Sequence, residues 1–251
     1  MNYQNSLKYQ IRGFWKPVIT FYIVIILVLV FGLTSAIILS GDGVRSSING
    51  LEFSTAIFIF VMGLNSFKED LFMLLQNGVS RKTFFLSSIG SFLVLGFLMS
   101  VIDVVVSLVT KLVVSHMEQV QYINFFEMLY RGKTTRMSAI SITLESFMLN
   151  LSMYLAAFLI GFFITISYYR MNKPMKVIIS VGVPVSVFIV LPIVDGIFHN
   201  KIVSAIGRAS DFAIGASAQK PLHAIVTLLI TFLVFSGLSW LLMRKVSVQN
   251  N

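Results

Sequence analysis

The sequence predicts an all-α membrane protein, and two observations lead to this: its composition and the length of its apolar segments. Apolar residues make up 57% and charged residues 12% of the chain, with a mean hydropathy of +0.89. Soluble domains contain about 45–50% apolar and about 25% charged residues. Runs such as 18–39 are continuously apolar, whereas the strands of a membrane barrel alternate. We therefore expect one membrane domain built from helices.

Six apolar segments have about the 20 residues that a spanning helix needs. They lie at about 18–39, 51–67, 84–109, 147–167, 177–197 and 222–243, followed by a tail at 244–251. Gly182, Pro184 and Pro192 predict a kink in the fifth span. Other polar residues within the spans are expected to make interhelical hydrogen bonds or to line a cavity. These are Asn65, Asn150, Ser152, Thr165 and Ser236.

Residues 1–17 predict a short amphipathic helix in the membrane interface. Its apolar residues recur at helical spacing and are Tyr3, Leu7, Ile11 and Phe14. Pro17 is suited to a first helical turn, so we expect the first span to begin there.

The distribution of basic residues predicts the orientation. Eleven Lys and Arg residues fall in the segments 1–17, 68–83, 168–176 and 244–251, and eight in the longer segments 40–50, 110–146 and 198–221. Basic residues close to span ends face the cytoplasm, so both termini are expected inside, with the chain in the cell membrane. The net charge of +9 is attributed to basic residues that set the orientation of the spans in the membrane, and no nucleic-acid partner is expected.

The connection between the second and third spans predicts a short cytoplasmic helix over 68–76. Glu69 and Asp70 are in its first turn, where negative charge suits the helix dipole. Leu71, Phe72, Leu74 and Leu75 would form an apolar side. An ordinary charged loop that holds the topology is the alternative.

The residues after this helix predict a sharp stop and an immediate restart. Asn77 and Gly78 tolerate the left-handed conformation that ends a helix. Ser80 is suited to capping the next helix, which Arg81 and Lys82 would hold at the cytoplasmic interface.

In this segment the chain resembles the membrane permeases of the ABC-2 exporter type, in which a coupling helix between spans two and three fits a groove on the ATPase. The amphipathic leader, the 69–76 helix, the run 77–84 and the six-span layout carry the resemblance. So does the connection 199–220, which in that family forms short, partly re-entrant outer helices. Size and loop style are most similar to small exporters of amphipathic peptides such as phenol-soluble modulins or antimicrobial peptides. The resemblance also implies which residues contact the ATPase. These are Lys68, Glu69, Asp70, Leu71, Phe72, Leu74, Leu75, Gln76, Gly78, Ser80 and Arg81.

The resemblance also implies the partners. They are a cytoplasmic ABC ATPase that binds ATP and Mg²⁺, a second permease copy that is identical or related, membrane lipids, and an apolar or amphipathic peptide or lipid-like substrate. The chain itself is expected to have no catalytic residues and to bind no cofactor or metal. Gly132, Lys133 and Thr134 are similar to the end of a phosphate-binding loop, but Glu127 replaces the glycine that such a loop needs.

Asp103 is an acidic residue within a long apolar stretch and is a functional candidate for that reason. Counted from Phe84 at about 1.5 Å per residue, it falls near the outer rim, within reach of water. Two other functions stay open: a proton-coupled secondary transporter that uses Asp103, and a non-transporting immunity or sensor subunit.

Overall fold

The computed structural model describes residues 3–39, 46–117, 120–135 and 137–244. Most of the predicted tail, from residue 245 on, lies outside these ranges. The elements in chain order are α1 (Tyr3–Leu39), β1 (Ser46–Asn49), α2 (Leu51–Asn65), α3 (Lys68–Gln76), α4 (Arg81–Val114), β2 (Val120–Ile123), α5 (Phe125–Leu129), α6 (Arg131–Thr134), α7 (Ala139–Arg170), α8 (Lys173–Val185), the π-helical segment η1 (Ser186–Val190), α9 (Leu191–Ile197), α10 (Lys201–Ile214) and α11 (Pro221–Met243).

The chain is an all-α membrane protein by length and composition of its helices. Within the described residues, five helical segments are long and apolar enough to cross a bilayer: α1, α4, α7, the continuous stretch Lys173–Ile197, and α11. The predicted second span corresponds to α2, which is apolar but has 15 residues. At about 1.5 Å per residue it reaches about 22 Å, less than the ~30 Å of a bilayer core.

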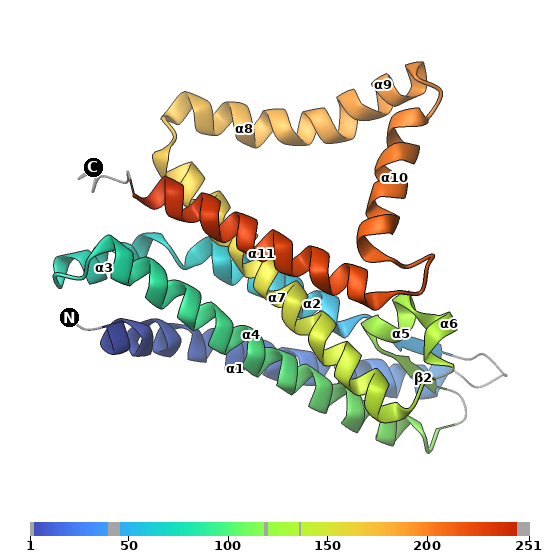
Figure 1. The fold of residues 1–251 in the computed structure, drawn as a ribbon. Helices are drawn as coiled ribbons and strands as arrows, with labels where there is room; N and C mark the ends of the chain where they lie inside the picture. Colours follow the sequence, from blue (N-terminus) through green and yellow to red (C-terminus); the bar gives the residue numbers. More distant parts are fainter. Residues whose placement is uncertain (1–2, 40–45, 118–119, 136, 245–251) are drawn as a thin grey trace.

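Helix α7 lies at the centre of the bundle, where it packs against α2, α4 and α11 (Figure 1). Two glycines allow α2 and α7 to approach closely. A Cβ on Gly63 would collide with the carbonyl oxygen of Phe158, and one on Gly161 would collide with that of Phe60. Thr165 on α7 also donates a 2.6 Å hydrogen bond to the carbonyl oxygen of Leu64. Small residues and interhelical hydrogen bonds are what hold helices together in a membrane.

Helix α1 differs from the sequence prediction, because the expected boundary at Pro17 is absent and one helix runs through it. Its first turns pack against α4 instead of standing apart. Ser6 and Gln10 are buried there, with Gln10 donating 3.2 Å hydrogen bonds to the hydroxyls of Ser87 and Ser88. The buried face therefore begins with polar residues, whereas Tyr3 of the predicted apolar face is exposed.

The end of the bundle opposite α3 contains structure that the sequence did not predict (Figure 1). Strands β1 and β2 pair in parallel, with Ser46 opposite Val120, and α5 and α6 follow β2. Two predicted spans are longer than expected at this end: α4 continues to Val114 and α7 already begins at Ala139.

Helices α8, α9 and α10 form an arm beside the bundle (Figure 1). In the most apolar window of Lys173–Ile197, no side chain is buried by the rest of the described chain. The predicted kink corresponds to η1, where the regular α-helical hydrogen bonding is interrupted between Pro184 and Pro192. Asp195 is buried at the tip, where its carboxylate accepts from the backbone N–H groups of Ile202 and Val203 at 2.8 and 3.0 Å.

Candidate functional site

The short helix α3 forms where the sequence predicts it and ends as predicted. Gly78 adopts a left-handed conformation with φ of 73°, and the backbone N–H of Val79 donates to the carbonyl oxygen of Leu74 at 3.0 Å. The next helix starts at once, because the hydroxyl of Ser80 accepts from the backbone N–H of Thr83 at 3.1 Å. These caps hold α3 in one orientation on the bundle.

The apolar side of α3 faces the bundle. Leu71 and Leu74 are both 1% exposed, in a cluster with Phe67, Val79 and Phe84. Phe72 and Leu75 are partly buried. Leu71 and Leu74 are thus part of the protein core, and the surface of α3 that is open to a partner is largely polar. Its exposed residues are Lys68, Glu69, Met73 and Gln76, and the exposed residues that follow it are Asn77, Gly78, Ser80, Arg81 and Lys82.

Asp70 on α3 is half-buried beside Glu69. Burial, with a smaller contribution from the charge of Glu69, raises the pKa of Asp70 from 3.8 to about 6. The carboxyl group of Asp70 therefore changes its charge in a range close to neutral pH.

Asp103 is buried inside the bundle, 7% exposed, which corrects the prediction that it reaches water. The hydroxyl of Tyr22 on α1 donates to its Oδ1 at 3.0 Å, and the hydroxyl of Tyr154 on α7 donates to its Oδ2. The carboxylate is shielded from water because α1 and α7 place Tyr22 and Tyr154 against it, which its position along α4 does not reveal.

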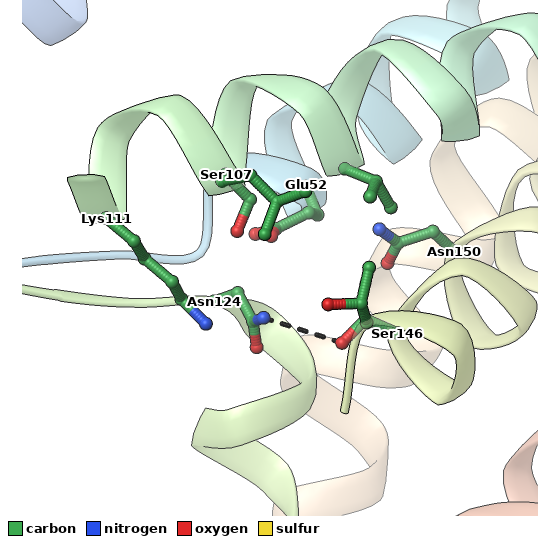
Figure 2. A pocket seen from close by; sticks show the side chains of 9 residues that line it. Glu52, Ser107, Lys111, Asn124, Ser146 and Asn150 are labelled. Atoms are coloured by element: carbon green, nitrogen blue, oxygen red, sulfur yellow. Dashed lines mark hydrogen bonds between the residues drawn. The ribbon is translucent and has the colours of Figure 1, made fainter. Parts of the chain in front are cut away.

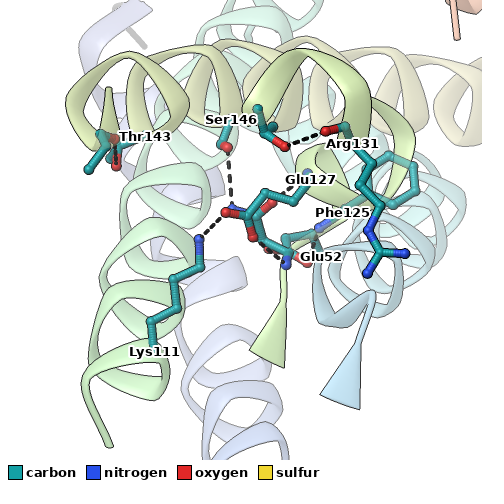
Figure 3. A network of polar contacts seen from close by, with 10 residues as sticks. Glu52, Lys111, Phe125, Glu127, Arg131, Thr143 and Ser146 are labelled. Carbon is teal, nitrogen blue, oxygen red and sulfur yellow. Dashed lines mark hydrogen bonds and ion pairs between the residues drawn. The ribbon is translucent and has the colours of Figure 1, made fainter. Parts of the chain in front are cut away.

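A second buried carboxylate, Glu52 on α2, belongs to a network of polar side chains that includes Lys111 and Glu127 (Figure 3). It is 3% exposed and accepts a 3.2 Å hydrogen bond from the backbone N–H of Phe125. Beside it, Lys111 and Glu127 form an ion pair of 2.6 Å, and Glu127 closes a capping box with Asn124 at the start of α5. The sequence interpretation missed Glu52, although an acid in the first turn of an apolar segment was a visible signal.

The residues that the sequence singled out belong to two separate places. Helix α4 begins beside α3, and Asp103 lies 22 residues, about 33 Å, further along it. Tyr22 and Tyr154 join Asp103 from two other helices, and only the folded chain brings them together. The residues that are similar to a phosphate-binding loop lie in α6, where Lys133 pairs with Glu145 at 2.6 Å.

Comparison with known proteins places no family name on this arrangement. No protein-family model, no curated protein and no solved structure matches this chain.

Proposed function

We propose that this chain is the membrane subunit of an ATP-driven exporter of the ABC-2 type. It works as a six-span permease in the cell membrane and moves an apolar or amphipathic substrate, such as a peptide or a lipid-like molecule. ATP and Mg²⁺ bind to a separate cytoplasmic ATPase. In this proposal the five long helical segments and α2 make six spans, and the residues that lead into α3 complete the span of α2.

The observation that carries the proposal is the packing of α3 against the helix bundle. A helix that transmits force must move with the bundle, and Leu71 and Leu74 join α3 to the core that includes Phe84 of α4. The surface left open contains charged residues and Met73, which is 47% exposed. An exposed methionine among polar residues is suited to contact with a partner protein.

The position of the chain ends supports the orientation. The start of α1, helix α3 and the end of α11 lie at the same end of the bundle (Figure 1). Arg81 donates a 3.4 Å hydrogen bond to the carbonyl oxygen of Arg244 there, and Arg170 donates one to that of Leu242. Basic residues gathered at this end make it the cytoplasmic side in our proposal.

The exposed arm supports the second permease copy. A segment of 25 residues, Lys173–Ile197, presents its apolar side chains outward, among them Phe188 at 78% exposed. We propose that the same segment of a second, identical chain packs against it. Lipid covering the arm is the alternative arrangement.

The test is recovery of an ATPase with the tagged chain from native membranes, identified by mass spectrometry. A glutamate at Met73 places a charge in the contact, so Met73→Glu should reduce the recovered ATPase by roughly tenfold or more. Met128→Glu is the matched control, because Met128 is 58% exposed on α5 at the opposite end. Recovery of no ATPase by the original chain, as the sensor or immunity function predicts, contradicts the proposal. So does equal recovery by the two variants.

A second candidate, a proton-coupled transporter, is favoured by the burial of Asp103 among hydroxyl groups. It predicts that Asp103→Asn stops transport at every ATP concentration while the protein still inserts into the membrane. The ATPase-driven exporter predicts that the same variant still recovers the ATPase and that transport still depends on ATP.

A further inference from the structure

A small cavity lies at the outer end of the bundle, between α2, α4, α7 and the start of α5. Its polar lining includes Glu52, Ser107, Lys111, Asn124, Ser146 and Asn150 (Figure 2). Its volume is about 10 Å³, enough for a single water molecule or an ion of similar size.

The cavity gathers oxygen atoms from buried side chains. Glu52 is 3% exposed, Ser107 6%, Ser146 5% and Asn150 2%. The Oδ1 atom of Asn150 has no hydrogen-bond partner among the described residues. Figure 2 shows its amide pointing toward the space between Glu52, Ser107 and Ser146. A buried carbonyl oxygen without a hydrogen-bond partner costs free energy, so a ligand that binds to this oxygen would stabilise the folded chain.

The charges around the cavity leave an excess of one negative charge. Lys111 and Glu127 are 2.6 Å apart and neutralise each other. Glu52 makes no ion pair within the part of the chain that the structure describes. Asp103, the next carboxylate inward, adds to the negative potential. Burying a carboxylate is unfavourable unless an opposite charge or hydrogen bonds compensate for it.

We propose that this cavity binds one sodium ion. The carboxylate of Glu52 supplies the compensating charge, and Oδ1 of Asn150 with the hydroxyl oxygens of Ser107 and Ser146 supply neutral ligands. All four ligands are oxygen atoms, which suit a hard cation. Lys111 lines the cavity, and its ion pair with Glu127 is partly exposed, with side-chain exposures of 32% for Lys111 and 21% for Glu127, so this pair lies between the cavity and the solvent.

The ligand set favours a monovalent ion over a divalent one. Ca²⁺ takes about 6–8 oxygen ligands, often with several carboxylates, and Mg²⁺ retains waters in an octahedral shell. A cavity the size of one water molecule has no room for such waters. Within the described ranges, no group of three or more His, Cys, Asp or Glu side chains is placed to hold a metal ion. The larger K⁺ fits this volume less well than Na⁺.

The proposed ion would join three helices. Glu52 lies in α2, Ser107 in α4, and Ser146 and Asn150 in α7. Because the site exists only when these helices are assembled, bound Na⁺ stabilises the folded chain by mass action. This inference is independent of the transport function proposed above.

The test uses the full chain purified in detergent, with unfolding followed as NaCl replaces choline chloride at constant ionic strength. We expect a saturable rise in Tm with NaCl, a weaker one with KCl, and retention of one radioactive sodium ion per chain. Glu52→Gln should abolish the rise and Asn150→Ala should weaken sodium binding by roughly tenfold or more. Glu145→Gln is the matched control, since Glu145 is partly exposed at the same end and pairs with Lys133.

Three outcomes would overturn the proposal. The first is an original chain that retains no sodium and whose Tm does not respond to NaCl, which means that the cavity holds water only. The second is a Glu52→Gln variant that responds to NaCl as the original chain does. The third is a larger stabilisation by CaCl₂ than by NaCl. If Glu52→Gln does not fold, Asn150→Ala and Ser107→Ala provide the same comparison, and an unchanged sodium affinity in both counts against the site.

Discussion

The hydroxyl of Tyr22 on α1 lies 3.0 Å from Oδ1 of Asp103 on α4, and Tyr154 of α7 donates to the other oxygen of the same carboxylate. One buried acid therefore joins three helices. Tyr22 also lies 3.1 Å from the carbonyl oxygen of Met99. In a membrane such contacts contribute to helix association, because apolar surface alone does not distinguish a neighbouring helix from lipid.

We expect Tyr22→Phe to destabilise the chain by about 1 kcal/mol, the range measured for interhelical hydrogen bonds in membranes. The ring remains in place and only the hydroxyl is lost. Thermal unfolding of the purified protein measures the effect as a lower Tm. Tyr9→Phe is the control on the same helix, because Tyr9 is 37% exposed. Equal Tm values for the two variants would show that the contact with Asp103 does not stabilise the bundle.

Gly63→Ala should destabilise the contact between α2 and α7 by about 1–3 kcal/mol, as overpacking does in cores. The added Cβ meets the backbone carbonyl of Phe158, which cannot move without shifting α7. Gly237→Ala is the control, because nothing lies within 4 Å of a Cβ built there. Alanine is the better helix former, so the control should be neutral or slightly stabilising. A higher Tm for Gly63→Ala would contradict the close packing.

The charge on Asp70 should make stability depend on pH. The folded chain holds the proton of Asp70 with a pKa of about 6 against 3.8 for the free group. Between these values the folded state binds more protons than the unfolded state, so stability is highest below the lower value and falls as the pH rises through about 6. Asp70→Asn should remove this fall and raise Tm at neutral pH. Unfolding measured across this pH range tests it, with Glu145→Gln as a control that retains the pH dependence. If Asp70→Asn keeps the full pH dependence, a group other than Asp70 causes it.

Cross-linking should detect a second copy at the arm. The chain contains no cysteine, so single substitutions report one position each. Val177→Cys, Val181→Cys and Phe188→Cys place thiols along one face of the arm, where the original side chains are 63%, 58% and 78% exposed. We expect disulfide-linked dimers in native membranes from at least one of them. Phe31→Cys on α1, where Phe31 is 74% exposed, is the control and should stay monomeric. Absence of dimers at all three positions would argue for lipid around the arm.

The sequence was most informative where structure depends on neighbouring residues. Helix α3, its end at Gly78 and the cap at Ser80 were predicted correctly, because left-handed glycine and serine caps are local features. Strands β1 and β2 were missed, since each has four residues and they pair across more than seventy positions. Glu52 was missed for a related reason: its burial comes from Phe125 and Lys111, far away in the chain.

The sequence by itself determined that the chain is helical and apolar enough for a membrane, because composition and run length decide both. The tertiary structure decided which side of each helix faces the protein. Ser6 and Gln10 are buried while Tyr3 is exposed, and Leu71 faces the core instead of a partner. The physical reason is that lipid is as apolar as a protein core, so hydrophobic spacing does not specify a direction. Close glycine contacts and hydrogen bonds, such as that of Tyr22 with Asp103, specify it once the helices have met.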